Sequence, residues 1–164
     1  MGQQQLLLLV LGIVIVGLAV VVGIQAFSEN QKKANADALV MTGMRIASDA
    51  QAWLRKPNQF GGAPLDASGN RRTDFNGLTV GTEISLEGLG YPVDATSGNY
   101  VDVNGIYAIA VNGNNLVISG GSATTSGAGD NNLICVTVSG VLVDNIVTAI
   151  NPSTVPGGCS VPTP

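Results

Sequence analysis

The chain has 164 residues, of which 11% are charged, and its formal net charge is −4. A mildly acidic chain without a basic patch is a poor match for nucleic acid, so we expect no nucleic-acid partner. The sequence contains no histidine, which excludes a Ser-His-Asp or Cys-His nucleophile and removes a common metal ligand. We therefore expect no enzymatic activity, no cofactor and no metal site.

The chain begins with an uncharged stretch in which residues 6–24 are all apolar or glycine. As a helix, these 19 residues span about 28 Å, close to the hydrocarbon thickness of a bilayer. No basic residue precedes the stretch and no clear small-residue cleavage site follows it, unlike an ordinary secretory signal. We expect a mature chain that begins at Met1 or within the next two residues. The stretch is then a single-pass anchor, or a segment that moves from the membrane into the core of a polymer.

A second helical pattern follows without a break, because residues 25–56 contain neither proline nor a glycine pair. Apolar and small side chains recur there in steps of three and four, the spacing of one helical face. We expect this face to pack on the rest of the protein through Leu39, Val40, Met44, Ala47, Trp53 and Leu54. Pro57 ends the pattern. The sequence thus predicts one helix of about 50 residues over 1–56, with a hydrophobic half (3–24) and an amphipathic half (25–56).

From residue 57 to residue 164 the composition shifts to Gly, Asn, Ser and Thr, with short β-branched runs between turn signals. Residues 105–111 and 115–119 flank an Asn-Gly pair, a strong hairpin signal. A Ser-Gly pair joins residues 133–138 to residues 141–147 and predicts a second tight hairpin. Residues 78–86 are a weaker strand candidate. These patterns predict a small antiparallel sheet that packs on the amphipathic half of the helix, an α+β fold.

Two further features of this region concern its faces and its loops. In the run before the Ser-Gly pair, Ile134, Val136 and Val138 alternate with Cys135, so the two sets point to opposite faces. Residues 120–132 lack apolar anchors and predict a mobile or exposed loop.

Only two kinds of site are suggested by single residues. Residues 66–74 gather several oxygen donors, as a Ca²⁺ loop does, but they lack the full calcium-loop spacing, and the pattern favours a solvated turn. Cys135 and Cys159 are the only cysteines and accompany an export-type segment, which indicates one disulfide in an oxidising compartment, with two free thiols as the alternative.

The layout resembles the type IV pilin superfamily, which includes bacterial type IV pilins and the pseudopilins of type II secretion. The resemblance rests on the apolar N-terminal helix, its amphipathic continuation ending near Pro57, the β-rich head and the late cysteine pair. It implies a pilin-like lollipop in which a Cys135–Cys159 disulfide clips a C-terminal loop. Family members carry Glu at the fifth mature position; if Met1 comes first, Gln5 stands there.

The resemblance also implies a function. We expect the chain to be a structural subunit of an extracellular type IV pilus-like filament (a fimbrium) on the cell surface. Such a filament is a helical homo-oligomer of identical copies of the chain. Its precursor is embedded in the inner membrane and meets a pilus assembly machinery. The alternatives are a pseudopilin of a secretion machine and a membrane-anchored surface binding module. Met1 and Gln5 are the expected register residues. The expected polymerisation core comprises Leu6, Leu9, Gly12, Ile13, Val16, Gly17, Val20, Gly23 and Ile24.

Overall fold

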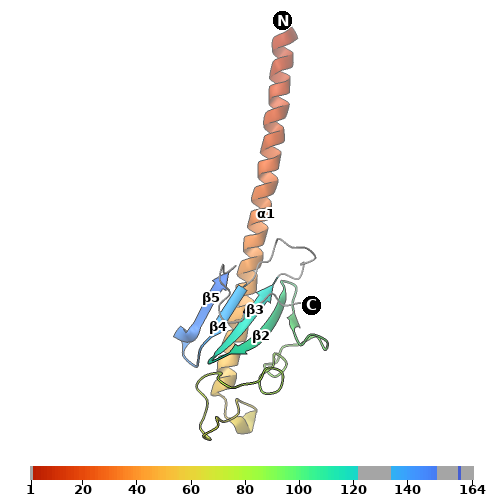
Figure 1. Ribbon diagram of the computed structural model, residues 1–164. Coiled ribbons are helices and arrows are strands. Elements are labelled where there is room, and N and C mark those ends of the chain that lie inside the picture. Colours follow the sequence, from red (N-terminus) through yellow and green to blue (C-terminus); the bar gives the residue numbers. More distant parts are fainter. Residues whose placement is uncertain (1, 122–133, 151–158, 160–164) are drawn as a thin grey trace. The chain divides into compact units, whose positions relative to one another are not determined.

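A computed structural model describes residues 2–121, 134–150 and 159 of the chain (Figure 1). Within these residues the helices and strands are α1 (Gly2–Arg55), η1 (Asn58–Phe60), β1 (Tyr100–Val101), β2 (Ile106–Asn112), β3 (Asn115–Gly121), β4 (Ile134–Val138), η2 (Val143–Asn145) and β5 (Ile146–Ile150). The α+β class is confirmed: a long N-terminal helix is accompanied by a five-stranded antiparallel sheet that packs on its later residues.

The chain divides into two compact units, Met1–Ala34 and Asn35–Pro164. The sequence-based division after residue 56 follows composition, whereas compactness places the boundary inside α1. The first unit consists of helix, and its described side chains are exposed apart from an intermediate position at Gly23. The helix ends at Arg55, two residues before Pro57, as predicted. Proline disfavours helical geometry in the residue before it and lacks the N–H that the next turn needs.

In the second unit, the sheet has the strand order β1-β2-β3-β4-β5. The predicted hairpin between β2 and β3 is confirmed: Asn112 pairs with Asn115, and Gly113 takes a positive φ of 58° in the turn. Such a turn matches the right-handed twist of the two strands, and glycine reaches a positive φ without steric cost. The sequence therefore placed this hairpin correctly.

The second hairpin differs from its prediction. β4 lies where it was expected, but β5 begins at Ile146, and the connection between them covers residues 139–145. Carbonyl groups in this connection accept hydrogen bonds from the end of α1: Gln51 Nε2 donates to Gly140 and Leu142, and Arg55 donates to Val141. The carbonyl groups of residues 140–142 bond to side chains of the helix, and β5 begins after them.

Two other predictions need correction. Residues 78–86 form no strand; they make turns with a single isolated bridge between Val80 and Ile84. Gly81 has a φ of 91° there, a conformation outside the β region. Of the loop predicted over residues 120–132, Gly120 and Gly121 belong to β3, and the remainder lies outside the described residues.

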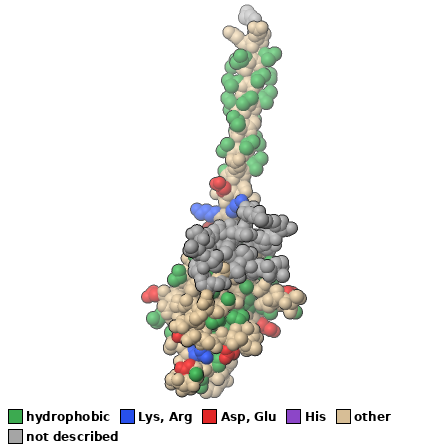
Figure 2. Space-filling view, viewed as in Figure 1, with side chains coloured by type: hydrophobic (Ala, Val, Ile, Leu, Met, Phe, Trp, Pro, Cys, Tyr) green, Lys and Arg blue, Asp and Glu red, His purple; other side chains and the backbone are tan. Residues whose placement is uncertain are grey.

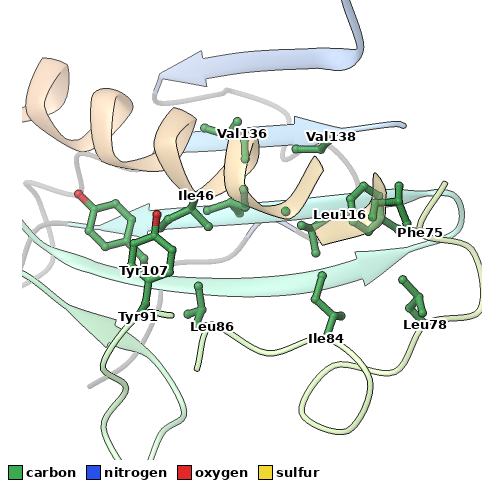
Figure 3. Close-up of a cluster of buried hydrophobic side chains, with 14 of the residues drawn as sticks. Ile46, Phe75, Leu78, Ile84, Leu86, Tyr91, Tyr107, Leu116, Val136 and Val138 are labelled. Atoms are coloured by element: carbon green, nitrogen blue, oxygen red, sulfur yellow. The ribbon is translucent and has the colours of Figure 1, made fainter. Parts of the chain in front are cut away.

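The core of the second unit lies between the later turns of α1 and one face of the sheet (Figure 3). The helix approaches β4 closely at Gly43, where a Cβ atom would come within 2.9 Å of Ile134 and 3.0 Å of Val136. The irregular segment after η1 adds further side chains to the same core. The largest fully buried side chains are Tyr107, Phe75, Leu39, Ile46, Leu54, Ile84, Leu86, Leu116, Ile118, Ile134, Val117 and Val136.

Candidate functional site

The first unit presents an apolar surface that the described chain does not cover. All fifteen Leu, Ile and Val side chains between Leu6 and Ile24 are 50–68% exposed (Figure 2). By length and composition, α1 is also the one described helix that could cross a membrane. A helix that is apolar all round needs lipid or other protein around it. This surface is the strongest candidate site in the described part of the chain.

The expected polymerisation core occupies one side of this helix. From Leu6 to Ile24 its members are spaced mainly in steps of three and four, which places them along one face. The other side is equally apolar and equally exposed, as Leu7, Leu18 and Val22 show at 63–68%. The geometry of a single subunit therefore does not favour the expected face over the opposite one.

The three glycines of the expected core are not required by the packing of the subunit itself. A Cβ atom built at Gly12, Gly17 or Gly23 meets nothing within 4 Å. Gly43 is different, because a Cβ there would press on Ile134 and Val136. The early glycines therefore leave open space on the helix surface, and a larger side chain there would meet no described part of the subunit.

The expected register residues lie at the start of α1. Met1 lies outside the described residues, and Gln5 is exposed within the helix. The first turn of α1 carries no acidic side chain. An exposed amide at position 5 can donate and accept hydrogen bonds, but it lacks the charge of a carboxylate.

The expected helix–sheet contacts are distributed as follows. Leu39, Ala47 and Leu54 are fully buried in the core, and Val40 and Trp53 are half-buried against it. Met44 is 45% exposed and is not part of the core, contrary to expectation. Each helical residue advances about 100°, so the residue after Gly43, which faces β4, turns away from the sheet. The sequence pattern counted Met44 among the buried residues, but it lies one position past Gly43, outside the part of the helix surface that the sheet covers.

Sequence reasoning missed Gln51, a polar side chain that is 6% exposed. Its Nε2 donates to the carbonyl oxygens of Gly140 at 2.7 Å and Leu142 at 2.8 Å. Burying an amide is tolerated when its hydrogen bonds are satisfied. In the sequence, Gln51 directly follows Ala50 of the apolar face. Periodicity alone places such a glutamine at the polar edge of that face and does not predict that it is buried.

The two cysteines form one disulfide, as expected. Cys135 and Cys159 are bonded, with their Cα atoms 6.0 Å apart, and both are buried. Cys135 points to the sheet face opposite Ile134 and Val136, where it forms a separate small cluster with Cys159 and Val117. The disulfide therefore ties Cys159 to the face of the sheet that lies away from the helix.

Several polar side chains outside this surface are engaged in local structure. The carboxylate of Asp66 accepts backbone N–H groups of Ser68 and Asn70, which makes residues 66–74 a hydrogen-bonded turn. Among the described residues, no three His, Cys, Asp or Glu side chains cluster as metal ligands. Tyr91 donates to the Asp49 carboxylate. Burial and this carboxylate raise the pKa of Tyr91 above its usual range, which keeps the phenol protonated.

Comparison with known proteins adds no assignment: no protein-family model, curated protein or solved structure matches the chain. The proposed function therefore rests on the fold and on the exposed apolar surface of α1.

Proposed function

We propose that the chain is the structural subunit of an extracellular type IV pilus-like filament that polymerises through its N-terminal helix. The long apolar helix and the antiparallel sheet are consistent with a pilin-like fold. The disulfide fits an oxidising, extracytoplasmic compartment. In this proposal the helix lies in the inner membrane first, an assembly machinery then extracts it, and the filament finally displays the second unit on the cell surface.

The observation that carries the proposal is the uncovered helix surface of residues 6–24. Burying a Val, Leu or Ile side chain is worth about 1.5–3 kcal/mol. For fifteen side chains that are 50–68% exposed, the unrealised gain is on the order of 10–25 kcal/mol. That is comparable to the whole stability of a typical domain, about 5–15 kcal/mol. The surface must therefore be covered by lipid, by other protein such as further copies of the chain, or by each in turn.

Two features favour a polymer over a simple anchor. The apolar half continues into the second unit as one helix from Gly2 to Arg55, without a flexible linker. In addition, a Cβ atom at any of the early glycines would meet no other atom of the subunit within 4 Å. Glycine is common in transmembrane helices. It also allows neighbouring helices to approach closely, and association of apolar helices depends on close packing and dispersion contacts.

The test replaces Gly12 or Gly17 with Leu in the cells that make this protein. Leucine is favourable in hydrocarbon, so membrane insertion should be retained. The added side chain should block helix packing, so fibres sheared from the surface should be lost while the subunit accumulates in the membrane. Negative-stain images of sheared material, with the subunit identified by mass spectrometry, provide the measurement. Val22→Leu, which adds one methylene to a side chain already present, is the matched control.

The outcomes separate the alternatives. Normal fibres from both glycine variants would rule out tight packing at these positions. If wild-type cells yield no fibres containing the chain under any growth condition, the filament is wrong, and an anchored module or a pseudopilin replaces it.

A further inference from the structure

The chain contains a single tryptophan, Trp53, near the end of α1. Part of its side chain packs against the hydrophobic core of the second unit, and part is accessible. Trp53 also lines a pocket of about 340 Å³, which we call the Trp53 pocket. The other lining residues are Asp49, Ala52, Lys56, Gly88 and Leu89. Sites for small molecules usually measure about 300–1,000 Å³, so this volume suits a small ligand.

The walls of the Trp53 pocket are ordered by the fold. Positions 49, 52, 53 and 56 are three or four apart, which places them along one flank at the end of α1. The other wall is a hydrogen-bonded turn. Gly88 and Leu89 donate their backbone N–H groups to Ser85, to its Oγ at 3.0 Å and to its carbonyl oxygen at 3.1 Å. A site that is formed before binding loses less conformational entropy when the ligand arrives.

Two opposite charges border the Trp53 pocket, and no other charged side chain of the described residues lines it. The carboxylate of Asp49 accepts a hydrogen bond from the hydroxyl of Tyr91, which holds it in place. Lys56 is exposed. Asp49 can accept further hydrogen bonds, and Lys56 can donate them. Because the lining has no net charge and exposed ion pairs contribute little, a neutral ligand with several hydroxyl groups fits this pair better than an ion.

Trp53 supplies an aromatic surface next to this pair of charges. The face of an aromatic ring carries negative charge density and offers a large apolar contact. One face of a pyranose ring consists of C–H groups that are polarised by neighbouring oxygen atoms. The hydroxyl groups at its rim both donate and accept hydrogen bonds. Such a ring can lie on an indole and bond to a carboxylate and an ammonium group at its rim.

We propose that the Trp53 pocket binds one pyranose ring of a neutral carbohydrate. The C–H face of the sugar lies on Trp53, and its hydroxyl groups bond to Asp49 and Lys56. Every lining residue belongs to the second unit, so binding does not depend on the proposed filament. In a filament, repeated copies of the pocket would hold a polysaccharide at many points, which raises the overall affinity.

Fluorescence of the single tryptophan tests this site directly. The full chain is kept in a polyoxyethylene detergent, which has no sugar head group, and is titrated with methyl β-D-glucopyranoside. The equatorial substituents of this sugar leave C–H groups on both faces of its ring. We expect a saturable change in Trp53 emission with a dissociation constant on the order of 1–10 mM. Sorbitol, which has hydroxyl groups but no ring, and valine, a zwitterion, should give no saturable change.

Filling the pocket should abolish binding without touching the core. Ala52→Gln adds a long side chain at an exposed lining position and retains a good helix former. It should weaken binding about tenfold or more, because the added side chain occupies the site of the sugar. Ser48→Gln is the matched control, since position 48 is exposed one turn earlier and lies outside the lining. It should bind within about twofold of the wild type.

Removal of the ammonium group provides a second test, which holds even if Ala52→Gln lowers the urea midpoint of unfolding. Lys56→Met keeps an unbranched side chain and should weaken binding about fivefold, because a charge-assisted hydrogen bond is lost. Lys33→Met, an exposed position in the first unit, is the matched control and should bind as the wild type does.

The outcomes separate this site from the filament. If the wild type gives no saturable response to the glucoside, the proposal is overturned, whether or not fibres form. A response that neither Ala52→Gln nor Lys56→Met weakens would place the sugar elsewhere and would also overturn it. An equal response to sorbitol or valine would exclude recognition of a pyranose ring. Loss of fibres with sugar binding intact would leave this inference in place and remove the filament.

Discussion

The two parts of α1 differ in how their apolar side chains are used. Between residues 6 and 24 every large apolar side chain is at least half exposed, while Leu39, Ile46 and Leu54 are fully buried. Their glycines differ in the same way: Gly12 has open space around it, and Gly43 lies against β4. The later turns obtain their packing partners from the same chain. The described part of the chain does not cover the earlier turns, which is the physical basis for proposing lipid or other protein around them.

The largest expected effect comes from the same truncation made in each part. Leu39→Ala should lower the free energy of unfolding of the second unit by about 2–5 kcal/mol, because it removes buried methyl groups and leaves a cavity. Leu9→Ala, at a position 63% exposed, should change it by less than about 0.5 kcal/mol. Urea titration of the full chain in detergent, followed by fluorescence of Trp53, measures both. Equal losses from the two variants would remove the distinction between the two parts.

Removal of the disulfide should act on the second unit alone. Cys135→Ser removes the bond that links two residues 24 positions apart in the sequence. It should lower the free energy of unfolding by about 3 kcal/mol, within a range of about 2–5 kcal/mol. Membrane insertion of the apolar helix should be unchanged. The same urea titration gives the stability, and membrane fractionation gives the insertion. Thr137→Ser, on the same face of β4, is the control. The prediction would be contradicted if the urea midpoint of wild-type unfolding were the same with and without reductant.

A smaller effect is expected at Gln51, which joins α1 to the β4–β5 connection. Gln51→Met keeps the length of the side chain but leaves the carbonyls of Gly140 and Leu142 without this donor, at a cost of about 1–3 kcal/mol. The exposed Gln31→Met should stay within about 0.5 kcal/mol of the wild type. Urea titration provides the comparison. A loss at Gln31 as large as that at Gln51 would show that the two hydrogen bonds carry no special weight.

The sequence by itself determined the features that depend on neighbouring residues. The uninterrupted helix and its end before Pro57 follow from the absence of breakers and from the geometry of proline. The position of the β2–β3 hairpin follows from the turn residues between the two strand patterns, although the turn lies at Gly113 and Asn114, one residue later than the Asn-Gly pair indicated. The alternation along β4 places Ile134 and Cys135 on opposite faces, because the side-chain period of a strand is two.

Only the tertiary structure decided the features that depend on distant partners. The late start of β5 accompanies hydrogen bonds from Gln51 and Arg55, which lie almost ninety positions earlier in the chain. Residues 78–86 carry strand-like residues but contribute Ile84 and Leu86 to the core from turns, because strand formation needs a paired neighbour and propensity does not supply one. The exposure of Met44 and the burial of Gln51 have the same origin. Periodicity predicts which residues share one face of a helix. The sheet that packs on this face decides which residues at its borders are buried.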